Sequence, residues 1–472
     1  MGTSAVLAGV ALLAGAGAPP SQIVLGVLLA FAPYALITLG DAVYPPRDAL
    51  HWALALGALS GLLLVAAPPV LSDDLYRYLW DARVLAEGTD PYLYAPDDPA
   101  LSALRDDLWS RINHPEVPTI YPPLAQLLFA AAEALAHAPW TVKLLALVAH
   151  LGTVPVVARL AGDRGGRAAL LHALNPLALV ESASSGHVDA VAGLALIACV
   201  AALLSNRTWW AVAFAAAAGG VKLVGLAIAP LVGIRDRRAG AAAILLCLLP
   251  LWPLLGAGAG SETTGGLGHY ARRWRGNDGL FSVVEAVASA TLSPVAVLTD
   301  SAPGHLRLPF LAPVLEAATG TAFDPRAAIT GPKKGVGDPV DFELDYVAGL
   351  LARGAVLAFV MGLALALARR RTDPLLAARW VLLSALLLSP QVHPWYLLWL
   401  LPIEVAAGRV AGLVWSVVIL AAYAPLDGWQ QGREWADSGL ARGAQHTLVL
   451  AVALLETAAG RKILGRVGVE VD

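Results

Sequence analysis

Apolar segments close to the length of a membrane crossing recur along almost the whole 472-residue chain. A helix needs about 20 residues to cross the hydrocarbon core of a bilayer. Only 14% of the residues are charged, against about 25% in soluble domains. The sequence predicts an all-α, polytopic integral membrane protein with about 11–14 transmembrane helices in a single transmembrane domain, residues 1–472. The candidate crossings lie near residues 3–18, 22–40, 50–70, 121–138, 141–161, 168–182, 187–204, 208–232, 239–256, 346–368, 375–390, 393–407, 410–426 and 442–459.

The composition also excludes several other classes of protein. The formal net charge is −3, and no basic run is long enough to indicate nucleic-acid binding. Cys199 and Cys247 lie inside apolar segments without metal-ligand spacing, and no glycine-rich phosphate loop follows a strand. We therefore expect the lipid bilayer but no nucleic acid as a partner, and no cofactor. A divalent metal would be compatible with the chemistry proposed below, but the residues do not support one.

Two polar regions, residues 71–120 and 257–345, are far longer than a turn between membrane helices requires. Short loops rich in Lys and Arg favour the cytoplasmic side of a membrane, and such loops occur at 235–238, 369–371 and 461–466. Counting crossings from them predicts that both polar regions are extracytoplasmic loops carrying surface helices, with the turn at 390–394 on the same face. The same count places residues 186–189 inside. It also places three arginines outside, against the charge rule: Arg159, Arg164 and Arg167.

The first polar region opens with a pair of carboxylates, Asp73 and Asp74, directly after an apolar run. A carboxylate at the membrane edge is partly desolvated, which raises its proton affinity and suits it to general-base catalysis. Asp is also a preferred N-cap, so the pair could instead start the amphipathic segment Leu75–Glu87. Arg77 and Asp81 in that segment are four residues apart, and they either pair with each other or bind substrate.

Further motifs follow in a fixed order along the chain: Gly88-Thr89-Asp90-Pro91-Tyr92, Tyr121-Pro122-Pro123, Asn175-Pro176, Gly186-His187-Val188-Asp189, Lys222 and His393-Pro394-Trp395-Tyr396. With Asp74, this ordered set resembles the polyprenol-phosphate-sugar-dependent glycosyltransferases of the GT-C superfamily, and more narrowly their mannosyltransferase branch. Many relatives have Asp-x-Asp where this chain has Ser72-Asp73-Asp74. The catalytic base is therefore either Asp73 or Asp74, and the spacing to Pro91-Tyr92 favours Asp74.

The resemblance implies a membrane glycosyltransferase that takes a hexose, most often mannose, from a polyprenyl-phosphate donor. A hydroxyl group of a glycan or glycolipid acceptor would displace the phosphate in one inverting step, with an Asp as base. The protein would lie in a bacterial plasma membrane with its active site on the extracytoplasmic face. Two alternatives stay open at this point: a lipid or sugar-lipid transporter, and a ligase that uses lipid-diphosphate donors.

Four basic side chains are candidates for holding the donor phosphate: His393, Lys222, Arg272 and Arg273. His393 could instead belong to an aromatic belt at the membrane interface, and the two arginines could be a juxtamembrane anchor. Lys222 lies inside an apolar run, where a charge is costly, so it needs a lipid phosphate or a carboxylate such as Glu181 or Asp189. The predicted substrate-binding residues are Arg77, Asp81, Tyr121, His187, Trp274, Trp395 and Tyr396.

Overall fold

The computed structural model describes residues 1–39, 48–256, 275–292, 297–298, 306–307, 339–436 and 438–457. Most of the predicted loop 257–345 lies outside the described residues, including Arg272, Arg273 and Trp274. Within the described part the chain is helical, apart from the antiparallel pair of two-residue strands β1 (Val297–Leu298) and β2 (Leu306–Arg307). The predicted all-α fold is confirmed.

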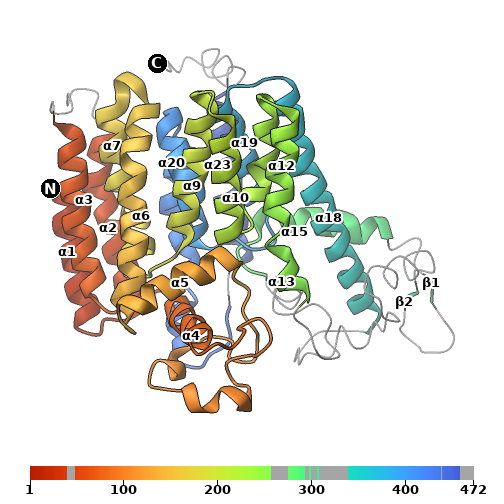
Figure 1. The fold of residues 1–472 in the computed structure, drawn as a ribbon, viewed down its shortest axis with the longest axis horizontal. Coiled ribbons are helices and arrows are strands. Elements are labelled where there is room, and N and C mark those ends of the chain that lie inside the picture. Colours follow the sequence, from red (N-terminus) through yellow and green to blue (C-terminus); the bar gives the residue numbers. More distant parts are fainter. Residues whose placement is uncertain are drawn as a thin grey trace.

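Most helices stand side by side in one bundle (Figure 1). Among the described residues, six helical segments are long and apolar enough to cross a membrane: Pro20–Ile37, Ala49–Ala66, Pro139–Leu160, Arg237–Leu254, Val347–Arg369 and Ala411–Gln430. The bundle consists of α1 (Gly2–Gly15), α2 (Pro20–Leu39), α3 (Ala49–Ala66), α6 (Pro139–Leu160), α7 (Gly165–Ala173), α9 (Asp189–Leu204), α10 (Thr208–Val221), α12 (Arg237–Leu248), α18 (Pro339–Arg369), α19 (Pro374–Leu387), α20 (Leu397–Ala407), α21 (Ala411–Val418) and α23 (Gly439–Leu455).

Shorter elements connect these helices or cover one end of the bundle. Between the bundle helices lie α8 (Pro176–Leu179), the π-helical turn Val180–Ser184, α11 (Gly225–Ile228), α13 (Leu251–Gly256), α22 (Leu426–Gln430) and 3₁₀ turns at Gly162–Arg164, Ala229–Ile234, Pro394–Tyr396 and Ile419–Tyr423. Outside the bundle lie α4 (Asp74–Ala86), α5 (Pro123–Leu135), α15 (Gly279–Leu292) and 3₁₀ turns at Pro99–Leu104 and Trp109–Arg111.

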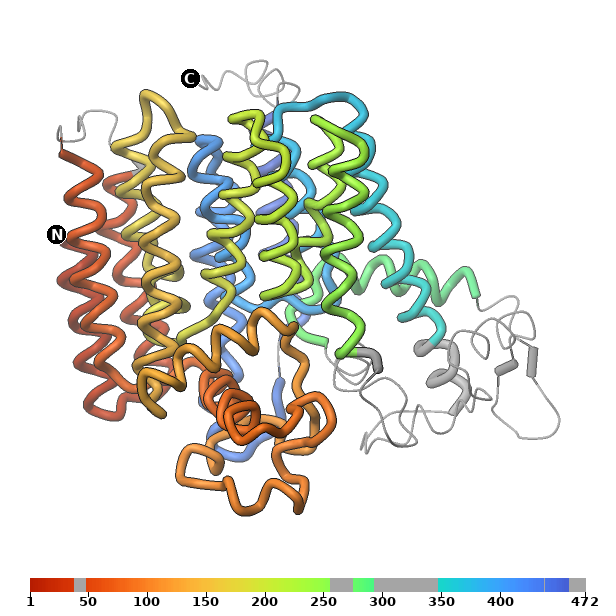
Figure 2. Tube along the Cα trace, viewed as in Figure 1, coloured from red at the N-terminus to blue at the C-terminus, as the bar shows by residue number. Residues whose placement is uncertain are grey.

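Helix α5 lies across the lower end of the bundle and does not cross it (Figures 1 and 2). Its 13 residues span about 20 Å, well short of a hydrocarbon core of about 30 Å. The predicted crossing at 121–138 is therefore wrong. Helix α6 starts at this lower end and ascends, so the turn between α6 and α7 reaches the upper end (Figure 1). The arginines of that turn thus join the other basic loops, which removes their apparent violation of the charge rule.

The predicted crossing at 208–232 is in fact two segments that meet at Lys222. Helix α10 descends to Val221, Lys222 adopts an extended backbone conformation, and α11 with the following 3₁₀ turn returns beside α12 and α18. The return ends at the upper side, where Arg235 Nε donates a 3.0 Å hydrogen bond to the carbonyl of Leu203 at the end of α9. Lys222 is therefore at the lower end of the bundle and not at its centre.

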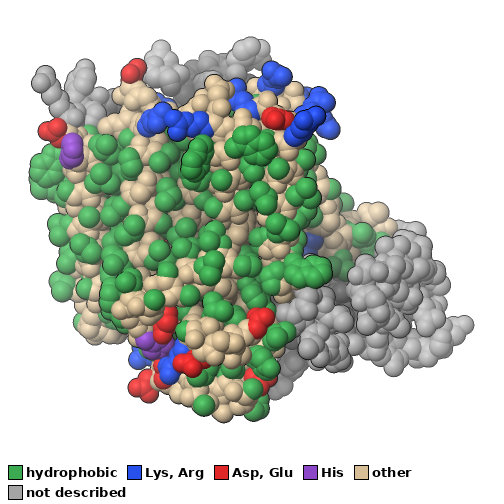
Figure 3. All heavy atoms as spheres, viewed as in Figure 1, with side chains coloured by type: hydrophobic (Ala, Val, Ile, Leu, Met, Phe, Trp, Pro, Cys, Tyr) green, Lys and Arg blue, Asp and Glu red, His purple; other side chains and the backbone are tan. Residues whose placement is uncertain are grey.

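Lys and Arg side chains gather at the upper end, above a wide apolar belt (Figure 3). Cations near a helix C-terminus bind its last carbonyls and interact favourably with its dipole. The basic loops therefore also hold the ends of the ascending helices. Four arginines donate such bonds: Arg167 to Ile37 of α2, Arg235 to Leu203 of α9, Arg164 to Ala406 of α20, and Arg409 to Glu456 after α23.

At the lower end, the Gly88–Tyr92 motif ends α4 and turns the chain back. Gly88 has φ +76°, and its N–H and that of Thr89 donate to the carbonyls of Leu85 and Val84. This is a Schellman C-cap, in which glycine is favoured because the left-handed conformation strains other residues. The Tyr92 hydroxyl then donates a 2.8 Å hydrogen bond to the carbonyl of Tyr121, so the motif holds the start of α5.

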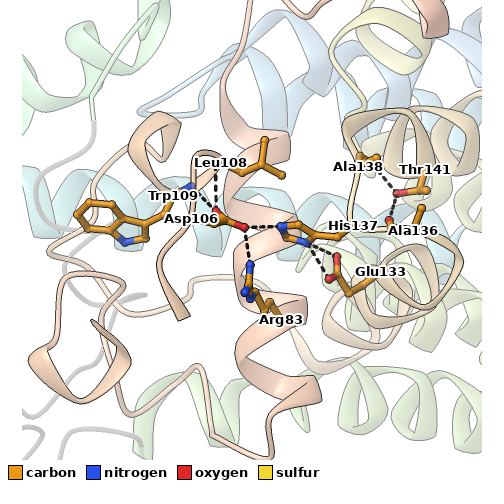
Figure 4. Close-up of polar contacts among 9 residues, drawn as sticks. All are labelled: Arg83, Asp106, Leu108, Trp109, Glu133, Ala136, His137, Ala138 and Thr141. Carbon is orange, nitrogen blue, oxygen red and sulfur yellow. Dashed lines mark hydrogen bonds and ion pairs between the residues drawn. The ribbon is translucent and has the colours of Figure 1, made fainter. Parts of the chain in front are cut away.

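A charged clasp ties the loop after α4 to α4 and α5 (Figure 4). His137, just beyond α5, lies 2.8 Å from Asp106 through Nε2 and 2.7 Å from Glu133 through Nδ1. Arg83 of α4 forms an ion pair with the same Asp106 carboxylate. The backbone N–H groups of Leu108 and Trp109 also donate to Asp106, so this one carboxylate orders the middle of the first polar region.

Candidate active site

A cavity of about 1320 Å³ opens at the lower end of the bundle. Segments far apart in the sequence line it: residues 69–77, 111–121, 275–277, 391–396, 421–430, 435–436 and 438–445, together with Lys222. It therefore brings the first polar region together with the turns that end α10 and α19. This is the largest grouping of predicted site residues in the described part of the chain.

The carboxylates of Asp73 and Asp74 face this cavity, where Asp74 begins α4. Asp73 occupies the N-cap position, but its side chain makes no capping hydrogen bond. Both carboxylates instead accept from one amide: Asn113 Nδ2 lies 2.7 Å from Asp73 Oδ1 and 2.8 Å from Asp74 Oδ1. The Asp74 N–H donates to Ser72 Oγ at 3.3 Å. The pair is thus oriented by neighbouring polar groups and does not serve as a simple helix cap.

The surroundings shift the pKa values of the two carboxyl groups in opposite directions. Desolvation pushes the pKa of Asp74 up, but His187, Lys222 and the Asn113 hydrogen bond outweigh it, and the net pKa is lowered. Desolvation and the adjacent charge of Asp74 raise the pKa of Asp73. The side chain of Asp74 is 18% exposed, so it is an ionised carboxylate that a molecule in the cavity can reach.

Lys222 lines the cavity from the end of α10. Its Nζ lies 3.4 Å from Asp189 Oδ2 and 4.9 Å from the centre of the Tyr121 ring. Of the partners that the sequence suggested for Lys222, Asp189 is the carboxylate that pairs with it. Because Lys222 keeps 16% of its side chain exposed, it can pair with this buried carboxylate and still contact an anion in the cavity.

Two rings from the turn before α20, those of His393 and Trp395, form a stack of three with the ring of His187. Trp395 lies between His393, with ring centres 4.2 Å apart, and His187, with ring centres 4.0 Å apart. Tyr396 stacks on Trp399 and also lines the cavity. Burial lowers the pKa of His393 to about 3. His393 is therefore neutral near pH 7 and can donate a hydrogen bond to a phosphate through one ring nitrogen.

Comparison with known proteins identifies the family. Residues 4–236 match the family model described as MptA/B family, alpha-(1->6)-mannopyranosyltransferase, N-terminal domain. The chain is a member of this mannosyltransferase family. No curated protein and no solved structure gives a significant match. The family confirms the predicted resemblance and the prediction of an enzyme. The matched region contains Asp74, His187 and Lys222, whereas His393 and Trp395 lie beyond it.

Two side chains that we predicted to bind substrate in this mannosyltransferase are buried away from the cavity. His187 is fully buried and lies behind Asp74, with 3.8 Å between its Nε2 and Asp74 Oδ2. Asp81 is 1% exposed and pairs with Arg77 at 2.8 Å, as one of our two alternatives predicted. Arg77 lines the cavity, and its Nη2 also donates a 2.7 Å hydrogen bond to the carbonyl of Val117. The Arg77–Asp81 pair therefore anchors the loop that carries Asn113.

Some residues of the mannosyltransferase cavity were missed in the sequence. Asn113, which bridges the carboxylates, is in an irregular loop and belongs to no recognisable motif. Arg442 reaches the cavity from the first turn of α23 and pairs with Asp278 at 2.5 Å. Arg111 also lines the cavity and donates a 3.1 Å hydrogen bond to the Tyr76 hydroxyl. An arginine at the start of an apolar helix, such as Arg442, is typical of a membrane anchor, and Arg111 lies in a short 3₁₀ turn of the polar region, so neither position carried a signal.

Among the described residues, no group of three or more His, Cys, Asp or Glu side chains is arranged to hold a metal ion. The positive charge that faces the cavity comes from Lys222, Arg77, Arg111, Arg275 and Arg442. In this part of the mannosyltransferase, an anionic leaving group would meet protein cations.

Proposed function

We propose that this mannosyltransferase moves a mannosyl group from a polyprenyl-phosphate donor to a hydroxyl group of a glycan or glycolipid acceptor, with Asp74 as the general base. The observation that carries the proposal is that Asp74 and Lys222 face one cavity that continues into an apolar groove. A base, a cation and an apolar extension are what a lipid-borne sugar phosphate requires.

The apolar groove has a volume of about 590 Å³ and lies between α2, the segment 417–424 and α23. It shares five lining residues with the catalytic cavity: Ala421, Tyr423, Ala424, Ala441 and Gln445. Burying a prenyl chain removes apolar surface from water, which contributes about 0.8 kcal/mol per CH₂. The groove therefore supports a donor whose phosphate lies in the cavity and whose chain extends among the helices.

The chemistry follows from the positions of the charged groups. Asp74 accepts the proton of the acceptor hydroxyl as its oxygen attacks the anomeric carbon of the donor, and the bond from that carbon to the phosphate oxygen breaks. General-base catalysis supplies about 10²–10⁴-fold. Lys222 stabilises the charge on the departing polyprenyl phosphate, and neutral His393 donates a hydrogen bond to it. Arg272 and Arg273, outside the described residues, remain predicted phosphate ligands.

The aromatic side chains and the family description define the sugar chemistry further. Tyr121, Trp395 and Tyr396 line the cavity and offer ring faces to a hexose. An alpha-(1->6) linkage, which the family description names, requires that the attacking oxygen is O6 of the acceptor sugar. One inverting displacement then requires a β-linked mannosyl donor.

The distribution of charge supports an orientation in the membrane. The basic loops lie at the end of the bundle opposite to α4 (Figures 1 and 3). Such loops favour the cytoplasmic side, so we place the cavity on the extracytoplasmic face of a bacterial plasma membrane. The donor would then enter from the outer leaflet.

The proposal is tested with purified full-length protein in lipid nanodiscs and n-octyl α-D-mannoside as acceptor. Three donors are compared: a polyprenyl-phosphate β-mannose, a polyprenyl-diphosphate mannose and GDP-mannose. We expect an alpha-(1->6)-linked product from the first donor only. Transfer from the diphosphate would support the ligase alternative. Transfer from GDP-mannose alone would contradict a lipid-borne donor.

A further inference from the structure

The turn Gly186–Asp189 places the side chains of His187 and Asp189 directly behind the cavity. It follows a π-helical turn, Val180–Ser184, a rare element that occurs frequently at functional sites. Gly186 has φ +75°, and an added Cβ would lie 3.3 Å from Lys143 Cγ. Both the backbone conformation and the space therefore favour glycine at this position.

A buried carboxylate lies on the far side of His187. Glu181 is 0% exposed, and its Oε1 accepts a 2.6 Å hydrogen bond from the Tyr423 hydroxyl. Its other oxygen, Oε2, lies 3.1 Å from His187 Nδ1. A buried carboxylate needs polar or charged neighbours, and His187 is the neighbour on this side of Glu181.

His187 also contacts the segment that carries the base. Its Nε2 lies 3.1 Å from Ser72 Oγ and 3.8 Å from Asp74 Oδ2. The same Ser72 oxygen accepts from the Asp74 N–H at 3.3 Å. His187 therefore reaches both the backbone and the carboxylate of Asp74, while Trp395 packs against its ring face.

We infer that His187 is a positioning residue, packed between Glu181 and Asp74, that orients the Asp74 carboxylate for proton transfer. This inference rests on the proposed role of Asp74 as the base. The same turn orients the other half of the site, because Asp189 pairs with Lys222. One buried turn thus sets the geometry of both the base and the cation.

The sign of the electrostatic effect can be stated from the groups that face Asp74. Asp73 on its own segment is negative, Lys222 at the end of α10 is positive, and His393 before α20 is neutral near pH 7. Burial raises the pKa of Asp74, and the largest opposing effects are those of His187 and Lys222, which lower it. Removing the His187 imidazole should therefore raise the pKa of Asp74. An opposite charge within about 4–6 Å shifts a carboxyl group by about 1–3 units.

The test compares His187→Gln and Glu181→Gln with the wild type in the full-length protein. Gln at 187 removes the imidazole, and Gln at 181 keeps an acceptor for Tyr423 while removing the carboxylate. His150→Gln is the matched control, because His150 is a buried histidine in α6 whose ring lies next to His172 and away from the cavity. The first readout is the pH profile of kcat/KM for transfer from polyprenyl-phosphate β-mannose to n-octyl α-D-mannoside.

We expect the acidic limb of that profile to move up by about 1–3 pH units in His187→Gln, and in the same direction in Glu181→Gln. The limb should stay in place in His150→Gln. A limb that moves in neither site variant, with only thermal stability lowered, would overturn the inference. If one site variant does not fold, the other still decides the question.

A second readout separates this inference from the proposed function. Carbodiimide labels protonated carboxyl groups, so the pH dependence of Asp74 labelling, followed by mass spectrometry, reports its pKa without any substrate. A shift in both site variants supports the inference even if the wild type fails to use a polyprenyl-phosphate donor. Unshifted labelling in both contradicts it even if the wild type transfers mannose normally.

Discussion

Replacing Lys222 with Met should separate the two roles of this side chain. Lys222 pairs with Asp189 at 3.4 Å, and Asp189 is 0% exposed. Removing one partner of a buried ion pair costs about 3–5 kcal/mol, because the remaining charge is uncompensated. Since Lys222 is itself 16% exposed, we expect Lys222→Met to fall near the lower value, about 3 kcal/mol. Thermal unfolding in nanodiscs measures this loss.

The double variant Lys222→Met/Asp189→Asn removes the uncompensated charge. Its stability should return most of the way to that of the wild type. Mannosyl transfer should not recover, because the leaving phosphate still lacks its cation. A hydrogen bond to a charged group contributes about 1.5–3 kcal/mol, which corresponds to a loss of about 10–100-fold in kcat/KM.

The control for this experiment is Asp189→Asn alone, which keeps the cation and loses only its buried partner. It should retain most of the transfer activity. If the double variant regained wild-type kinetics, Lys222 would be a structural partner of Asp189 and nothing more. If Lys222→Met were as stable as the wild type, the energetic argument for the buried pair would be wrong.

Three further predictions concern topology, the donor chain and the clasp. Cysteine at exposed Ser102 should be labelled from outside intact cells, and cysteine at exposed Ser205 should not; the opposite pattern would invert the orientation. Leu28→Trp should narrow the apolar groove. It should raise KM about tenfold for long-chain donors and leave KM for short-chain donors unchanged. The control Leu59→Trp, on the lipid-facing side of α3, should leave KM unchanged for both kinds of donor. Desolvation raises the pKa of Asp106, but backbone hydrogen bonds, His137 and Arg83 outweigh it, so the net pKa is lowered. The clasp therefore contributes its full stability above the ordinary Asp pKa of about 3.9. That contribution is lost as the pH falls through the lower pKa of the folded protein. Asp106→Asn should therefore flatten the acid branch of thermal stability measured against pH, and an unchanged branch would contradict this.

The helical class and the pair of carboxylates that faces the cavity were accessible from sequence, because apolar length and an isolated pair of carboxylates are local signals. The crossing count was not accessible. Pro123–Leu135 is apolar enough to resemble a crossing, but packing against α4 makes it a surface helix. That one difference placed Arg164 and Arg167 on the wrong side and separated His187 from Asp74. The contact between this helix and α4 determines that it does not cross the membrane, and a hydropathy pattern carries no information about such a tertiary contact.

The partners of the site residues were also beyond the sequence. Glu181 and Tyr423 are 242 positions apart in the chain, yet they share a 2.6 Å hydrogen bond. Asn113 reaches Asp73 and Asp74 only because the Arg77–Asp81 pair and the Asp106 clasp fold the loop back. Contacts of this kind depend on how distant segments pack, so motif spacing alone could suggest the base but not the groups that orient it.

The most direct test of the account is the rate of transfer from polyprenyl-phosphate β-mannose to n-octyl α-D-mannoside by Asp74→Asn, with Asp73→Asn as the matched neighbour. We predict that Asp74→Asn keeps the thermal stability and the donor affinity of the wild type and loses at least about 10²-fold in turnover. Asp73→Asn should retain most of the activity, because the carboxylate held ionised by His187 and Lys222 is that of Asp74. Near wild-type turnover in Asp74→Asn, with or without an inactive Asp73→Asn, would contradict the assignment of the base.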